Sequence, residues 1–234
     1  VISYLQRPLW AHPPDTSTVK TWHDFSDDVV AFFNQQNISN VVAVGHSMGA
    51  VSAFLAASKQ PHLIKALVMI EPVVFSRGFC WLNRILPRFI RHRVPIINKT
   101  LNRPDQWPNF QAAFDFHRRT RAFRRVNDEQ LWQYIKAGVK ADDKGIHRLV
   151  YDKHWEAHVY QTVTPIRKML LQSGLPVLAL RGVDTDTIPV SFWQRWHSNE
   201  NHHLVEIPDS SHLLPLERPA KVLSHVLPFI EQHR

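Results

Sequence analysis

Four short apolar runs recur along the chain, and segments with helical spacing lie between them. The runs are 41–44, 66–70, 177–180 and 204–207. The run at 41–44 is continuous and mostly β-branched, which is typical of a strand covered on both faces, as in a parallel sheet. The run at 204–207 is interrupted by Glu206. We also expect a short buried strand at residues 1–4 and, from three prolines, a loop over residues 5–18.

Three segments have the pattern of helices. Thr21 precedes a segment with apolar side chains at helical spacing, and Asp24 follows three positions later, which predicts a capping box. A second helix is expected over 50–59 and a third over 219–232, where Pro228 should kink or shorten it. Because strands alternate with helices, the pattern predicts an α/β fold with a mostly parallel sheet.

Positive charge is concentrated in the middle of the chain. The 234 residues contain 28 Lys and Arg against 20 Asp and Glu, a formal net charge of +8. Residues 76–170 hold 19 basic and 8 acidic side chains, whereas the rest holds 9 basic and 12 acidic ones. This step in composition predicts a first core part at 1–75, a helical basic cap insert at 76–170, and a second core part at 171–234.

The basic side chains of the insert fall into two clusters. One contains His117, Arg118, Arg119, Arg121, Arg124 and Arg125, and the other contains Arg88, Arg91, His92 and Arg93. A solvated helical face is one interpretation, and contact with an anionic partner or a membrane surface is the other. The chain has no zinc-finger spacing and no aromatic RNA-binding signature, so no specific nucleic-acid partner is expected.

Composition narrows the class of protein. Hydrophobic residues make up 44% and charged residues 21%, which excludes a disordered tail, a collagen-like fibre and a coiled coil. No apolar run reaches the length of a membrane-spanning helix. The single cysteine, Cys80, cannot form an internal disulfide, and the opening residues lack the features of a signal peptide. We therefore expect a cytoplasmic protein.

Residues 45–49, Gly-His-Ser-Met-Gly, fit the pattern Gly-x-Ser-x-Gly where a strand is predicted to meet a helix. A tight turn there would make the Ser47 hydroxyl project from the sheet, and Gly45 and Gly49 would let strand and helix pack closely. The Met48 N–H, at the start of the helix, is placed to stabilise an oxyanion. His46 is expected to be a packing or hydrogen-bonding neighbour.

Further candidate groups follow the other predicted strands. A serine nucleophile needs a base, and His212 follows the run at 204–207. The histidine needs an acid, for which Asp184 and Asp186 follow the run at 177–180 and Glu71 follows the run at 66–70. Since the carboxyl ends of parallel strands meet at one edge of the sheet, we expect these groups to form one site.

The order of serine, acid and histidine resembles that of the α/β-hydrolase superfamily, in its lid-bearing serine esterase and lipase-like branch. The similar segments are 41–50, 66–72, 177–187 and 207–219, the last with His-Leu-Leu-Pro-Leu-Glu-Arg-Pro. The resemblance implies an α/β-hydrolase-type sheet flanked by helices, with a helical cap insert and without the family's amino-terminal strands and His-Gly loop. It makes Asp186, four residues after Gly182, the first choice for the acid, with Asp184 second and Glu71 third.

The resemblance further implies a serine hydrolase that cleaves a small carboxylic ester, with an apolar acyl group, through an acyl-enzyme and without a cofactor. A thioester, lactone or carbon–carbon bond would suit the same groups. A non-catalytic binding protein that uses the basic cap is the alternative class. His154, Glu156 and His158 do not have the zincin order, so no metal site is expected.

Overall fold

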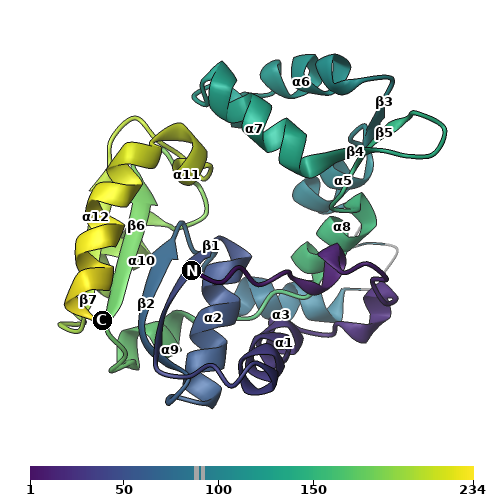
Figure 1. Cartoon of the computed structure of the whole chain (residues 1–234). Coiled ribbons are helices and arrows are strands. Elements are labelled where there is room, and N and C mark those ends of the chain that lie inside the picture. Colours follow the sequence, from purple (N-terminus) through teal and green to yellow (C-terminus); the bar gives the residue numbers. More distant parts are fainter. Residues whose placement is uncertain (87–89, 91–92) are drawn as a thin grey trace. The chain divides into compact units, whose positions relative to one another are not determined.

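The computed structural model describes residues 1–86, 90 and 93–234, which form two compact units (Figure 1). The first contains Val1–Tyr4, Thr21–Cys80 and Thr164–Arg234, and the second contains Leu5–Lys20 and Trp81–Val163. In the middle of the chain, the second unit thus covers a shorter stretch of sequence than the predicted insert at 76–170. It also includes residues 5–20, which were expected to belong to the core. Arg88, Arg91 and His92 of the smaller basic cluster lie outside the described residues.

The first unit is built on a four-stranded parallel sheet. Its strands are Val41–His46 (β1), Ile64–Ile70 (β2), Val177–Gly182 (β6) and His202–Ile207 (β7), in the order β1-β2-β6-β7. All four apolar runs therefore form strands, each two residues longer than the run that predicts it. β2 is almost fully buried because it lies between two neighbouring strands and under helices.

Helices surround this sheet. They are Trp22–Gln35 (α1), Met48–Lys59 (α2), Arg167–Gln172 (α9), Val190–Trp196 (α10), Leu214–Glu217 (α11) and Pro219–Gln232 (α12). The capping box at Thr21 and Asp24 is present at the start of α1. α12 continues past Pro228 to the predicted end, so the expectation that this proline shortens the helix is wrong.

Apolar side chains from the strands and from α12 form the core of the first unit. Val68 and Ile70 of β2 and Leu178 and Leu180 of β6 pack with a larger set that is continuous across the sheet. The other buried members are Ile207, Leu214, Val222 and Val226. Removing this apolar surface from water is the main force that holds α12 on the strands.

The strand predicted at residues 1–4 is not formed. These residues have no strand pairing in the described part of the chain, and the Ile2 side chain is 67% exposed. An apolar run becomes a strand only when a neighbouring strand satisfies its backbone N–H and C=O groups. Tyr4 instead places its ring 5.2 Å from that of Phe32 on α1.

The second unit is mostly helical, with a small antiparallel sheet that the sequence did not indicate. The helices are Pro95–Leu101 (α5), Phe110–Arg118 (α6), Asp128–Gly138 (α7) and Lys153–Gln161 (α8), with 3-10 turns at Arg7–Leu9, Thr16–Thr18 and Arg121–Phe123. The strands Gln106–Trp107 (β3), His147–Leu149 (β5) and Val139–Ala141 (β4) pair in that order. A further helix, Arg77–Ile85 (α3), runs from one unit into the other along the chain. In the described residues, no helix is long and apolar enough to cross a membrane.

Gly45 is the residue of β1 for which the packing leaves least room. A Cβ atom at this position would lie 2.5 Å from the backbone nitrogen of Ala50 in α2. We expect Gly45→Ala to lower the free energy of unfolding by about 1–3 kcal/mol, because backbone rather than a flexible side chain blocks the space. Chemical denaturation measures this change.

Gly174→Ala is the matched control, since a Cβ atom there meets nothing within 4 Å. We expect it to change the free energy of unfolding by no more than about 0.5 kcal/mol. Equal stability of the two variants would show that the β1–α2 junction tolerates a side chain.

Candidate active site

Ser47 lies at the junction between β1 and α2, where the chain turns sharply. Its backbone has φ 56° and ψ −124°, a left-handed conformation that costs energy for a residue with a side chain. The Ser47 N–H donates to the Ile70 carbonyl at 3.0 Å, which ties the turn to the end of β2. The structure therefore supports a strained turn here by a long-range backbone contact.

His212 meets the Ser47 hydroxyl. Its Nε2 atom lies 3.0 Å from Ser47 Oγ, and its Nδ1 atom lies 3.5 Å from Glu71 Oε2. The three side chains come from the ends of three different segments of the first unit and form one continuous chain of polar contacts. In a proton-transfer role, Nε2 would face the nucleophile and Nδ1–H the acid.

Glu71 is the carboxylate of this chain, and its position is fixed by several donors. The side chain has no exposed surface. Oε1 accepts from the Gly182 N–H, and Oε2 accepts from the hydroxyls of Thr185 at 2.5 Å and Thr187 at 2.8 Å. A buried carboxylate is tolerable only when such donors replace water. Oε2 is also the oxygen that faces His212.

Of the three carboxylates considered for the acid, the structure places Glu71 beside His212. Asp186, the first choice, and Asp184, the second, are both exposed. The turn after β6 instead directs Thr185 and Thr187 toward Glu71. The third choice, Glu71, is the residue that the structure places beside the imidazole.

His46 supports the backbone of the His212 loop. Its Nε2 atom lies 2.8 Å from the His212 carbonyl oxygen, so Nε2 carries the hydrogen and donates it. Burial lowers the pKa of His46 to about 4, and the charge of His212 lowers it as well. His46 is therefore neutral near pH 7 and acts as the hydrogen-bonding neighbour that the sequence predicted.

Glu217 of α11 stabilises the same loop by hydrogen bonds. Its carboxylate accepts from the Ser211 N–H and from the Ser211 hydroxyl, each at 2.5 Å. The main chain of Ser210 lies so close to Gly182 that a Cβ atom there would be 2.6 Å from the Ser210 oxygen. These contacts fix the two residues that precede His212. None of them was identified from the sequence, which shows only an acidic residue five positions after the histidine.

The first N–H groups of α2 face the same region. Met48 is the first helical residue after Ser47, so its N–H has no acceptor within the helix. The amino end of a helix also carries a partial positive charge. The Met48 N–H therefore lies, without an acceptor in its own helix, directly after Ser47.

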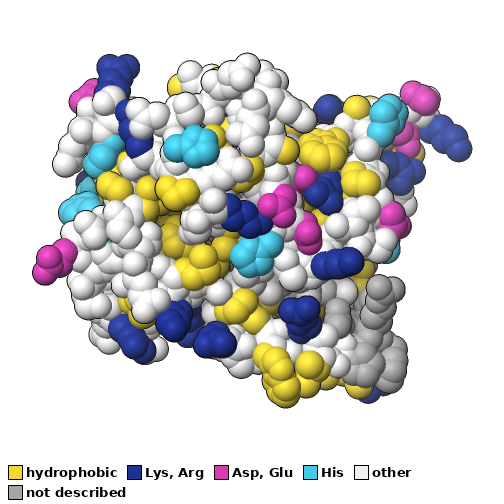
Figure 2. Space-filling view, turned by 90° about the horizontal axis from the view of Figure 1, so that it is seen from below, with side chains coloured by type: hydrophobic (Ala, Val, Ile, Leu, Met, Phe, Trp, Pro, Cys, Tyr) yellow, Lys and Arg dark blue, Asp and Glu magenta, His cyan; other side chains and the backbone are white. Residues whose placement is uncertain are grey.

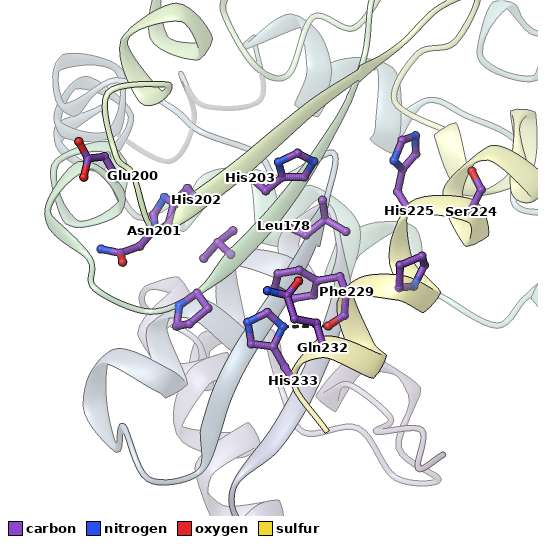
Figure 3. Close-up of a pocket in the computed structure, with 13 residues that line it drawn as sticks. Leu178, Glu200, Asn201, His202, His203, Ser224, His225, Phe229, Gln232 and His233 are labelled. Atoms are coloured by element: carbon purple, nitrogen blue, oxygen red, sulfur yellow. Dashed lines mark hydrogen bonds between the residues drawn. The ribbon is translucent and has the colours of Figure 1, made fainter.

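A separate cavity of about 470 Å³ lies beside α12 (Figure 3). Leu178, His202 and His203, which belong to the starts of β6 and β7, are among its lining residues, as are His225 and Phe229 of α12. Because the sheet is parallel, these strand starts lie at the edge opposite to the one that carries Ser47. This cavity is not part of the candidate active site.

Two of the three residues considered for a metal site, Glu156 and His158, have structural partners. Glu156 accepts from Arg103 at 2.5 Å, and His158 Nε2 lies 2.7 Å from the Val19 carbonyl oxygen. In the part of the chain that the structure describes, no group of three or more His, Cys, Asp or Glu side chains is arranged to hold a metal ion.

Comparisons with known proteins agree with this fold. A sequence model of the alpha/beta hydrolase family matches residues 7–225. The chain is 22% identical over 217 residues to the uncharacterized hydrolase YugF of Bacillus subtilis, which covers 91% of this chain and 73% of that protein. It is also 35% identical over 65 residues to the sn-1-specific diacylglycerol lipase ABHD11 of Xenopus laevis. That alignment covers 26% of this chain and 21% of that protein.

A solved structure is also similar. The solved structure of E-2-(acetamidomethylene)succinate hydrolase matches this chain with a TM-score of 0.77 at 17% identity. The match covers 97% of this chain and 79% of the other. At this identity the likeness concerns the fold alone. The alignments to four curated relatives cover between 21% and 73% of the relatives' own lengths.

The lowered pKa of His46 has a consequence for stability. In the unfolded chain the imidazole takes up a proton near pH 6.5, whereas in the folded protein it does so only near pH 4. The unfolded state therefore binds more protons between these values, and stability falls as the pH is lowered through them. We expect His46→Gln, which keeps a donor for the His212 carbonyl, to reduce this loss by about 1–3 kcal/mol.

Denaturation curves at pH 7 and pH 4.5 measure the effect. His203→Gln removes an exposed histidine from β7 and should keep the wild-type pH dependence. If His46→Gln loses as much stability on acidification as the wild type does, the buried neutral state of His46 is refuted.

Proposed function

This chain belongs to the alpha/beta hydrolase family, and from that premise we propose that it is a serine hydrolase that cleaves carboxylic esters through an acyl-enzyme. The observation that carries the proposal is the contact chain from Ser47 through His212 to Glu71, with distances of 3.0 and 3.5 Å. A hydroxyl, an imidazole and a carboxylate in this order are the groups that acyl transfer requires.

In the first half of the reaction, Ser47 Oγ attacks the ester carbonyl carbon while His212 Nε2 accepts the hydroxyl proton. The carbonyl oxygen becomes negatively charged, and the Met48 N–H donates a hydrogen bond to it. Glu71 holds the imidazole ring and offsets the charge of the imidazolium. His212 then gives the proton to the departing alcohol oxygen as the carbon–oxygen bond breaks.

In the second half, water replaces the alcohol. His212 takes a proton from the water as the water oxygen attacks the acyl carbon, and it returns a proton to Ser47 Oγ as the acid leaves. His46 and Glu217 act as positioning residues, because they hold the loop of His212 rather than touching the reacting atoms.

For the substrate, we propose a small ester with an apolar acyl group. The support is the diacylglycerol lipase among the partly similar relatives, whose name describes cleavage of a fatty-acyl ester. As a further partner we propose an anionic surface, because the excess of basic side chains in the second unit favours contact with one.

The nucleophile is tested with a fluorophosphonate probe. We expect covalent labelling of the wild type at Ser47 and none of Ser47→Ala, because only the hydroxyl beside His212 is activated. Mass spectrometry of the labelled peptide identifies the site. Ser224→Ala, which removes an exposed hydroxyl of α12, should label as the wild type does.

Labelling that persists in Ser47→Ala would contradict the assignment of the nucleophile. A folded wild-type chain that stays unlabelled would favour the non-catalytic binding protein instead.

The acid is tested by a pair of isosteric substitutions. Glu71→Gln keeps the shape of the side chain but removes the charge that stabilises the imidazolium, so we expect kcat to fall by about 10³–10⁴-fold. Asp186→Asn changes an exposed carboxylate and should leave kcat within about twofold. Hydrolysis of a p-nitrophenyl ester measures both values. The opposite result would restore Asp186 as the acid.

A further inference from the structure

Helix α3 exposes large apolar side chains on one face, while its opposite face buries the small Cys80 side chain. Asn83 is buried, and its Nδ2 donates to the Tyr160 carbonyl of α8 at 2.9 Å. Trp81, Leu82 and Ile85 face away and are 64%, 50% and 53% exposed. Helices of globular proteins normally bury the apolar side and expose the polar one. The outward face of α3 is therefore suited to an apolar environment other than this chain's own core.

The three exposed side chains share one face of the helix. At 3.6 residues per turn, Trp81, Leu82 and Ile85 lie within an arc of about 100°. An arc of this width is what an amphipathic helix presents when it lies on an apolar surface. In Figure 2, exposed hydrophobic side chains also gather with Lys and Arg side chains near them.

The charge of the surrounding sequence has a single sign. Residues 72–104 contain seven Lys and Arg side chains and no Asp or Glu. Arg84 of α3 is exposed, as are Arg93 and Lys99 farther along. Exposed apolar side chains followed along the chain by arginine and lysine complement a membrane interface that carries anionic headgroups. A protein partner would need acidic side chains placed to match, whereas an anionic bilayer supplies phosphates in any register.

The denser basic cluster is less suited to this role. His117 is buried, with Nδ1 2.7 Å from the Ala113 carbonyl oxygen. Arg118 donates to the carbonyls of Phe123 and Val126, which fixes the turn after α6. Part of this cluster therefore stabilises the fold of the second unit.

We propose that the outward face of α3, formed by Trp81, Leu82 and Ile85, docks on an anionic phospholipid membrane. The three apolar side chains enter the boundary between headgroups and acyl chains, and Arg84 and Arg93 bind lipid phosphates. Trp81 suits this position because its ring is apolar and its indole N–H can reach a polar group. The proposal is independent of the hydrolase activity, because it uses no residue of the candidate active site.

Vesicle flotation with the full chain tests the proposal. We expect binding to vesicles that contain phosphatidylserine, and at least about tenfold weaker binding to vesicles of phosphatidylcholine alone or at raised salt. The combined variant Trp81→Ser, Leu82→Ser and Ile85→Ser should bind at least about tenfold more weakly than the wild type. The double variant Arg84→Gln with Arg93→Gln should bind vesicles several-fold more weakly than the wild type. It tests the proposal even if the serine variant does not fold.

The matched control is Leu223→Ser with Leu227→Ser, which removes two leucines of α12 that are 51% and 53% exposed. It should bind vesicles as the wild type does. Equal binding by the α3 variants and the wild type would overturn the proposal. Equal binding of the wild type to vesicles with and without phosphatidylserine would also overturn it. A dimer in sedimentation analysis that the serine variant dissociates, without vesicle binding by the wild type, would show that a second copy covers this face instead.

Discussion

A carboxylate removed from water must receive its hydrogen bonds from the protein, and Glu71 meets this requirement where the strand ends converge. Its donors are the N–H of Gly182 and the hydroxyls of Thr185 and Thr187, so the end of β2 is tied to the turn after β6. Left without them, the buried charge would cost several kcal/mol. The arrangement leaves Oε2 facing His212, and the position of the imidazole therefore depends on this set of donors.

The turn at Ser47 imposes the second constraint. A serine with φ 56° persists only where its surroundings hold it, and here a backbone hydrogen bond to Ile70 does so. The close approach of α2 to β1 requires the absence of a side chain at Gly45. The same junction carries His46, which reaches the carbonyl of His212. One local turn thus places the hydroxyl and also anchors the loop that brings the imidazole to it.

Sequence patterns predicted the parts of the structure that local rules determine. Each short, mainly apolar run became a strand, and the helix at 219–232 has the predicted ends. The pairing of Ser47 with His212 followed from the shared edge of parallel strands. The contact between His212 and Glu71 did not follow, because Asp184, Asp186 and Glu71 all come after strands and only side-chain direction separates them. That direction is set by Thr185 and Thr187, whose contacts with Glu71 span more than a hundred positions of the chain.

The exposed apolar face of α3 follows the same physical logic as the buried carboxylate, since each places a group where bare water or bare apolar core would not favour it. Glu71 is compensated by donors inside the first unit, whereas the exposed Trp81 has no comparable compensation in water. A membrane interface would supply it. Esters with an apolar acyl group also concentrate in that interface, so a hydrolase docked there would meet its substrate at a raised local concentration. The two proposals are tested separately, and each would give the other a physical role: the membrane concentrates the ester that the hydrolase cleaves.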